Sequence, residues 1–192
     1  MYLVAFYGGL ALFFATHLFT VFRSRAEGNI VQRIGRGPYM GLYSLLSLAG
    51  FIAFAWGFSE MRPWTQLWIP PDWTRHLATA LMLPAIILIV AAYAPAGYIK
   101  KAVKHPMLTA VILWAAAHLA ANGDLGSLIL FGSFLAFSLL DRIVVSRRGD
   151  QGAAAANPNI YGDLIALAVG GAFYAAIIYY LHPLIIGVPV LI

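Results

Sequence analysis

The chain of 192 residues contains no cysteine and few charged side chains. The absence of cysteine excludes disulfides, thiolate nucleophiles, iron–sulfur clusters and cysteine-ligated zinc. Charged residues make up 10% of the sequence, against about a quarter in ordinary soluble domains. Hydrophobic residues account for 62%, and the mean hydropathy is +0.83. This small number of charges cannot cover a water-exposed surface. The composition therefore excludes a soluble globular protein and indicates an integral membrane protein.

Six separate apolar segments account for most of the chain. We expect membrane-spanning helices at Tyr2–Phe22, Pro38–Phe58, Thr74–Tyr98, Pro106–Ala121, Leu125–Val145 and Tyr161–Leu181, with His182-Pro183 ending the last one. The fourth has 16 residues, which at 1.5 Å per residue gives about 24 Å, less than a ~30 Å hydrocarbon core. The pattern predicts an all-α, polytopic six-helix bundle that forms a single domain over residues 1–192.

Lys and Arg residues are confined almost entirely to alternate loops. Ten of the twelve lie in the first, third and fifth connections or at the adjoining helix ends, and only Arg62 and Arg75 lie on the opposite side. The positive-inside rule therefore predicts cytoplasmic basic loops and both termini outside. Because no basic run exceeds two residues, the net charge of +5 reflects these loops and not a nucleic-acid surface.

Ionisable side chains are scarce within the predicted spans, and each is a candidate functional group because burying one in hydrocarbon is costly. We identified His17, His118 and Asp141 inside the spans, and His76, His105 and His182 near helix ends. Histidines at helix ends can reach lipid headgroups and water. Asp141 can pair with the adjacent Arg142, so most of this set needs no functional role.

His17 and His118 are different because both lie among apolar and aromatic residues. One interpretation is that each imidazole hydrogen bonds to a neighbouring helix. The other is that the two imidazoles together hold one metal centre between helices. Zinc requires three or four ligands, which these spans do not supply, whereas a low-spin haem needs two axial ligands, which two imidazoles can provide, and an apolar, aromatic slot.

Three further residues are candidates around such a haem. Trp114 and Asn122 lie four residues before and after His118, so all three share one helix face and the first two are expected neighbours of the ligand. Arg36 could pair with a haem propionate on the cytoplasmic side, although the topology alone already accounts for a basic residue there.

The predicted topology places His17 and His118 at different depths in the membrane. At 1.5 Å per residue their α-carbons would differ in depth by about 10 Å. Helix tilt and the length of the imidazole side chains can absorb this difference. If they do not, His105 is the better-matched partner of His17, since both lie towards the cytoplasm.

Three stretches carry a resemblance to a known family: ATHLFTVFRSR at 15–25, GRGPYMGLYSLLSLAGF at 35–51 and KHPMLTAVILWAAAHLAANGDLGSLILFGSF at 104–134. The most specific feature is His105-Pro106, with His118 thirteen residues after His105. Together they resemble the NnrU family of bacterial membrane proteins over nearly the whole chain. The resemblance implies a multi-pass protein of the bacterial inner membrane, associated with nitrite and nitric oxide reduction.

NnrU proteins are in turn similar to the 15-cis-zeta-carotene isomerases of plants and algae, which are membrane haem b proteins. By position, the two haem-ligating histidines of those enzymes match His17 and His118. The isomerases carry a cysteine shortly before the second histidine, where this chain has only alanines. Exchange of an axial imidazole for a thiolate is therefore not open to this chain.

Three roles follow from the resemblance. The preferred one is a redox or haem-dependent component of denitrification that binds haem b. The second is a haem-dependent cis–trans isomerase acting on a carotenoid or another apolar polyene that enters from the bilayer. The third is a haem-free assembly or transport partner of a nitrogen-oxide reductase. Whether the protein is an enzyme stays open at this level.

Overall fold

A computed structural model describes residues 1–155 and 157–190. Its secondary structure is helical, and within the described residues the β-pairing is limited to an isolated bridge between Gln66 and Asp124. In this part of the chain, five helices are long and apolar enough to cross a membrane, and a further apolar helix is shorter. These helices confirm the predicted all-α membrane class. The chain folds as two compact units, Met1–Thr65 and Gln66–Ile192, and a single domain over all 192 residues stays a prediction.

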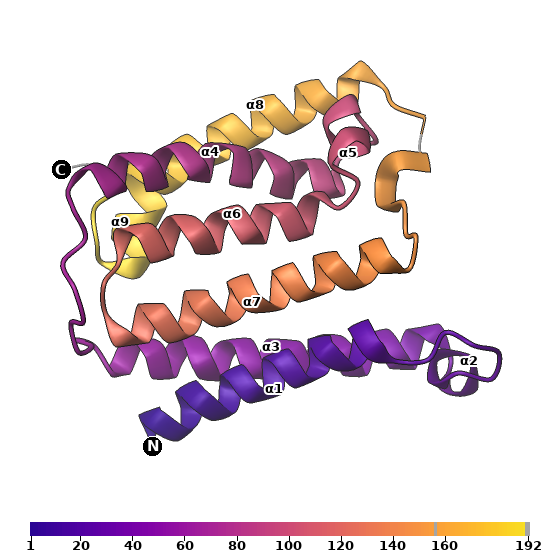
Figure 1. Ribbon diagram of the computed structural model, residues 1–192, viewed down its shortest axis with the longest axis horizontal. Helices are drawn as coiled ribbons and strands as arrows, with labels where there is room; N and C mark the ends of the chain where they lie inside the picture. Colours follow the sequence, from indigo (N-terminus) through magenta and orange to yellow (C-terminus); the bar gives the residue numbers. More distant parts are fainter. Residues whose placement is uncertain (156, 191–192) are drawn as a thin grey trace. The chain divides into compact units, whose positions relative to one another are not determined.

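The first unit is a helical hairpin. Helix α1 (Tyr2–Phe22) runs antiparallel to α3 (Arg36–Glu60), and the short α2 (Ile30–Ile34) lies in the connection between them (Figure 1). Helix α1 has the predicted bounds. Helix α3 begins at Arg36 and not at Pro38. Proline is tolerated anywhere in the first turn of a helix, because the N–H groups of that turn have no intrahelical partner, so the helix can begin two residues before Pro38.

Glycines allow the two helices of the hairpin to approach closely. A Cβ added to Gly50 of α3 would lie 2.9 Å from the carbonyl oxygen of Gly9 in α1. A Cβ on Gly57 would lie 2.7 Å from the carbonyl oxygen of Tyr2, and Phe6 is fully buried beside this contact. Lipid tails are as apolar as leucine, so helices associate in a bilayer mainly through such close packing.

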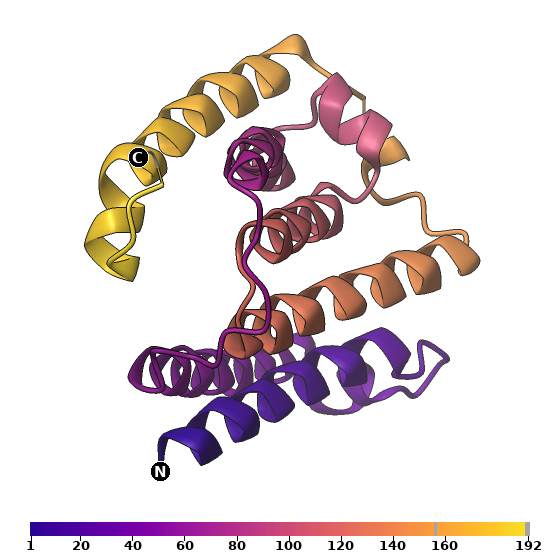
Figure 2. The ribbon, with the colours of Figure 1, turned by 60° about the vertical axis from the view of Figure 1, so that its left-hand side comes forward.

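The second unit contains four long or medium helices in a row. In order across the row they are α8 (Ile160–Ala176), α4 (Trp73–Tyr93), α6 (Pro106–Ala121) and α7 (Leu125–Arg147) (Figures 1 and 2). The short α6 is therefore flanked by α4 and α7. Its Ala110, Ala115 and Ala117 are completely buried, and small side chains of this kind let helix backbones pack closely.

Two further predicted helix boundaries were wrong. The third span ends at Tyr93 and not at Tyr98, because the chain turns through Pro95 and Gly97 before a separate short helix, α5 (Tyr98–Val103). The last span does not end at Leu181. It continues through a wider π-helical turn, η2 (Ile177–Leu181), into α9 (His182–Ile186).

The π-helical turn and the proline after it change the direction of the last helix. Pro183 lies in the first turn of α9, where its missing N–H costs little. Figure 2 shows α9 turned sharply away from the direction of α8, as expected where a π turn interrupts the helical ladder. His182 lies at the same bend, and its Nδ1 donates to the Val188 carbonyl oxygen at 2.7 Å.

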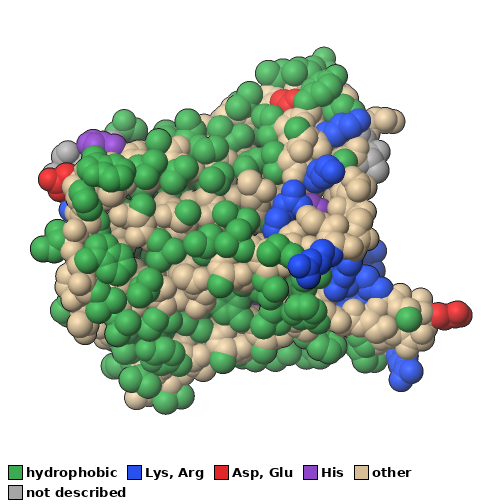
Figure 3. Space-filling view, viewed as in Figure 1, with side chains coloured by type: hydrophobic (Ala, Val, Ile, Leu, Met, Phe, Trp, Pro, Cys, Tyr) green, Lys and Arg blue, Asp and Glu red, His purple; other side chains and the backbone are tan. Residues whose placement is uncertain are grey.

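The exterior of the second unit is apolar along its helices and basic at one end. Large apolar side chains such as Leu164, Leu167 and Val169 of α8 are exposed, as expected for contact with a lipid bilayer. Lys and Arg side chains gather at the end where α5 lies (Figure 3), while Arg75 lies at the start of α4. The protein is thus a multi-pass membrane protein, and its orientation with both termini outside stays a prediction.

Candidate functional site

His17 lies on α1 with its imidazole ring held against two aromatic rings. Its Nδ1 lies 2.7 Å from the carbonyl oxygen of Phe13, one turn earlier. A carbonyl oxygen only accepts hydrogen bonds, so Nδ1 carries the proton and Nε2 carries the lone pair of the neutral ring. The ring centroid lies 4.1 Å from that of Phe13 and 5.3 Å from that of Tyr43 on α3. A backbone carbonyl at Nδ1 is one of the partners by which proteins orient an imidazole for metal ligation through Nε2.

His118, near the end of α6, repeats this arrangement in the second unit. Its Nδ1 donates to the Trp114 carbonyl oxygen at 2.8 Å, and its ring is stacked on Phe131 of α7 with centroids 4.5 Å apart. The Trp114 ring lies 5.2 Å from the imidazole and contacts Phe134 as well. Trp114 is therefore a neighbour of the His118 ring, as the spacing predicts.

Asn122 contacts His118 in a different way. Its side-chain Nδ2 donates to the backbone carbonyl oxygen of His118 at 2.8 Å, which also accepts from Asn122 N at 3.0 Å, so Asn122 closes the end of α6 with two hydrogen bonds. The next residue, Gly123, accepts hydrogen bonds through its carbonyl oxygen from Leu67 N and Trp68 N. Gly123 thus anchors the helix end that bears His118 to the tryptophan-containing loop before α4.

The two histidines share one local design, with one example in each unit. Each has an aromatic residue four positions earlier, whose carbonyl holds Nδ1 and whose ring packs on the imidazole. Both imidazoles are half-buried. Within the described residues no three His, Asp or Glu side chains come together as a metal site would require. The candidate ligands are therefore these single imidazoles.

His105, the alternative ligand, forms its hydrogen bond through Nε2, whereas His17 and His118 form theirs through Nδ1. Its Nε2 lies 3.2 Å from the carbonyl oxygen of Asp150, so the proton of the neutral ring lies on Nε2. His105 follows a tight turn at Lys104, where φ is +65° and ψ is −52° and where His105 N bonds to Val103 O at 2.8 Å. This is a γ-turn with a positive φ, which is rare and strained for a residue with a side chain.

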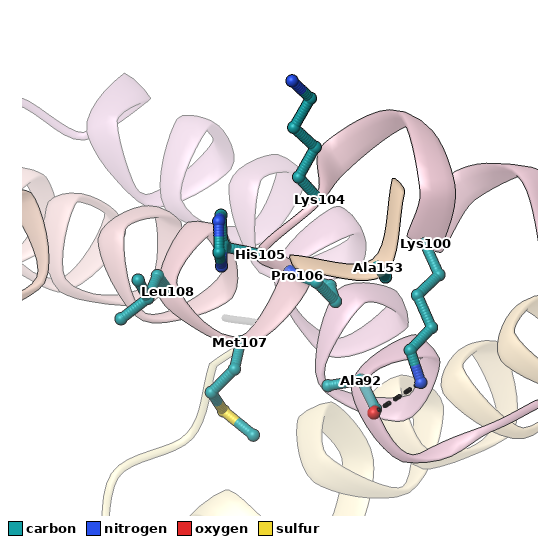
Figure 4. A pocket seen from close by; sticks show the side chains of 8 residues that line it. All are labelled: Ala92, Lys100, Lys104, His105, Pro106, Met107, Leu108 and Ala153. Carbon is teal, nitrogen blue, oxygen red and sulfur yellow. Dashed lines mark hydrogen bonds between the residues drawn. The ribbon is translucent and has the colours of Figure 1, made fainter. Parts of the chain in front are cut away.

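The loop after α7 is fastened over this turn. Ala153 N donates to the Lys104 carbonyl oxygen at 2.9 Å, and Lys104 Nζ donates to Gln151 Oε1 at 3.0 Å. An open hollow of about 280 Å³ lies beside the turn. Figure 4 shows that Lys100 points towards the end of α4, where its Nζ donates to the Ala92 carbonyl, whereas Lys104 points away from the other lining residues. The hollow is therefore not a site in which both ammonium groups converge.

The strained turn leads to a stability prediction at Lys104. Glycine adopts a positive φ without steric cost, whereas alanine and lysine adopt it only at a steric cost. Both Lys104→Gly and Lys104→Ala lose the exposed bond to Gln151, so the comparison isolates the backbone. We expect Lys104→Gly to be more stable than Lys104→Ala, with a free energy of unfolding about 1 kcal/mol larger. Thermal denaturation in detergent measures the difference, and equal stability would show that the turn relaxes without cost.

Two buried polar atoms lack hydrogen-bond partners within the described residues, and both lie in the α1–α3 hairpin. They are Arg23 Nε and Ser47 Oγ. Ser47 shares a face of α3 with Tyr43, one turn away, and Tyr43 contacts the His17 ring. The guanidinium of Arg23 lies over the ring of Tyr39, 5.2 Å from its centroid. Buried polar groups are normally satisfied, so these two atoms in the unit that contains His17 require an explanation.

Arg36, the sequence-based candidate for a propionate partner, is the first residue of α3 and is exposed. Its guanidinium makes no hydrogen bond within the described part of the chain. The structure therefore places a second arginine, Arg23, in a more enclosed position at the same end of the hairpin.

Asp163 is a buried carboxylate that sequence reasoning overlooked, although it lies inside the last predicted span. It is 7% exposed and accepts hydrogen bonds from Tyr98 N at 2.9 Å and Ile99 N at 3.0 Å. These are unpaired N–H groups at the start of α5, which Asp163 caps from the first turn of α8. Gly97 packs directly against the carboxylate, with no room for a Cβ. The signal in the sequence was an acidic residue just after a helix-capping Asn159.

Comparisons with known proteins agree with this picture of the whole chain. The family model described as "NnrU protein" matches residues 5–190. Comparisons with curated proteins and with solved structures gave no match.

Proposed function

The chain belongs to the NnrU family, and on that premise we propose that it is a haem b protein of the bacterial inner membrane. In this proposal His17 and His118 are the axial ligands, and the protein serves as a redox component of nitrogen-oxide metabolism. The metabolic assignment comes from the family resemblance. The ligand assignment comes from the chemistry of the two imidazoles, each considered in its own unit.

The observation that carries the ligand assignment is the hydrogen bond at Nδ1 of each imidazole. It leaves the Nε2 lone pair of His17 and of His118 as the ligating group and holds each ring in one orientation. His105 directs Nε2–H to a carbonyl, so it suits ligation through Nε2 less well. The aromatic rings around each ligand, and the unpaired Arg23 Nε in the same unit as His17, support a large apolar cofactor with a polar edge.

Two imidazole ligands favour electron transfer over substrate binding at iron. A haem supplies one-electron redox chemistry. A haem held by both imidazoles would have no ligand position left for a small molecule. The backbone bonds at Nδ1 hold both rings in one orientation, and Phe13 and Phe131 pack against them. The isomerase and the haem-free partner stay predictions without a structural observation in their favour.

Haem content and ligation can be tested on detergent-purified protein. We expect a pyridine haemochromogen spectrum of haem b and a low-spin, six-coordinate absorption spectrum. His17→Ala and His118→Ala should each abolish the low-spin spectrum and weaken haem retention more than about tenfold. The double variant should be colourless. His76→Ala is the matched control, because His76 is exposed on α4 and should leave the spectrum unchanged.

The alternatives give different results in the same experiment. Wild-type protein that stays colourless when haem is supplied would contradict the proposal and favour a haem-free partner protein. An unchanged Soret band in both single variants would show that the ligands are wrong. Loss of the low-spin spectrum in His17→Ala and His105→Ala, but not in His118→Ala, would replace His118 by His105.

A further inference from the structure

The end of the hairpin beyond His17 is lined by polar groups from both helices. Thr20 Oγ1 and the hydroxyl of Tyr39 are 2.8 Å apart, and Tyr39 is 8% exposed. The guanidinium of Arg23 lies over the Tyr39 ring. Along α1, Arg23 follows His17 by six residues, or about 9 Å along the axis. A cation is thus held within reach of the histidine, in the same unit.

Arg23 is not fully used by the contacts that hold it. Its Nη1 donates to the Ser24 carbonyl oxygen at a long distance of 3.4 Å, and its buried Nε has no hydrogen-bond partner within the described residues. An arginine presents five N–H donors in a planar fork, whose geometry matches a carboxylate. A buried N–H without an acceptor is energetically costly, so an acceptor from a ligand would relieve this cost.

The chemistry of haem shows where its carboxylates would lie. A porphyrin carries its two propionates on one edge, and ionised carboxylates are costly in hydrocarbon. His17 lies five residues before the end of α1, so the shorter way out of the apolar region is towards that end. Arg23 follows α1 directly at that end as the capping residue.

We propose that Arg23 binds a propionate of the haem that His17 ligates, through its Nε and one terminal nitrogen. This role rests on the proposed function, because it requires the haem. It assigns the main carboxylate contact to Arg23 and a smaller one to the exposed Arg36. Tyr39 positions the guanidinium by stacking under it.

The test measures haem affinity and midpoint potential for wild type, Arg23→Gln, Arg23→Lys and Arg36→Gln. Arg23→Gln should weaken haem binding about tenfold, the value of one charge-assisted hydrogen-bonded pair. It should also lower the midpoint potential, because a cation beside the haem favours the reduced state. Arg23→Lys keeps the charge and should keep the potential. Arg25→Gln is the matched control, since Arg25 is exposed in the same loop.

Haem dimethyl ester, in which both propionates are esterified, separates carboxylate binding from a structural role. Wild-type protein should bind the ester about tenfold more weakly than haem, and Arg23→Gln should bind haem and ester alike. If Arg23→Gln weakens both ligands equally, Arg23 acts on the fold and the inference is overturned. A larger loss in Arg36→Gln than in Arg23→Gln would also overturn it. If the wild-type protein does not bind haem, both this inference and the proposed function are contradicted. If haem binding depends on His17 but Arg23→Gln binds haem as tightly as wild type, only this inference is contradicted.

Discussion

Gly50→Val is expected to destabilise the α1–α3 hairpin by about 2–3 kcal/mol. A Cβ at this position would lie 2.8 Å from Phe13 N and 2.9 Å from the Gly9 carbonyl oxygen. Both are backbone atoms that cannot turn aside, so the helices must separate and lose their close packing. Thermal or detergent-induced unfolding, followed by circular dichroism or protease resistance, measures the change in the free energy of unfolding.

Gly41→Val is the matched control for this hairpin prediction. Gly41 lies on the same helix, and an added Cβ there meets no atom of this unit within 4 Å. Valine has a slightly better helix propensity than glycine, so this variant should be as stable as wild type or slightly more so. Equal destabilisation of both variants would mean that close approach at Gly50 does not hold the hairpin together.

Asp163→Ala is expected to destabilise the second unit by about 3 kcal/mol. The substitution leaves the N–H groups of Tyr98 and Ile99 without their charged acceptor in a buried position. Each unsatisfied buried donor costs about 1–3 kcal/mol. Asp163→Asn keeps one oxygen and should lose about half as much. Unfolding measurements in detergent give these differences. The amide hydrogen-exchange rates of Tyr98 and Ile99 should increase most in Asp163→Ala and less in Asp163→Asn.

Asp150→Ala provides the comparison for this second prediction. Asp150 Oδ1 also accepts a backbone hydrogen bond, from Gly152 N at 2.8 Å, but the residue is exposed. Water can replace its oxygen, so the loss should stay below about 1 kcal/mol. A cost at Asp163 as small as the cost at Asp150 would show that water reaches the start of α5.

Much of the candidate site could be predicted from residues close in sequence. His17 and His118 are conspicuous because ionisable groups are rare in apolar segments, and Trp114 lies one helical turn from His118. The hydrogen bonds that select the Nε2 lone pair join residues four apart, so a helix brings them together wherever it lies. The opposite tautomer of His105 depends on Asp150, which is 45 residues away, and no local pattern indicates it.

Hydropathy and length determined the membrane class, the approximate spans and the uneven distribution of basic residues, because these are sums over neighbouring residues. Only the tertiary structure decided that Asp163 caps α5, since its two donors lie more than sixty residues before it. The same is true of Arg23, whose guanidinium lies over the ring of Tyr39 from the opposite helix and whose buried Nε has no hydrogen-bond partner within the described residues. A hydrogen bond or a buried cation is a relation between distant segments, and composition along the chain contains no record of which segments will meet.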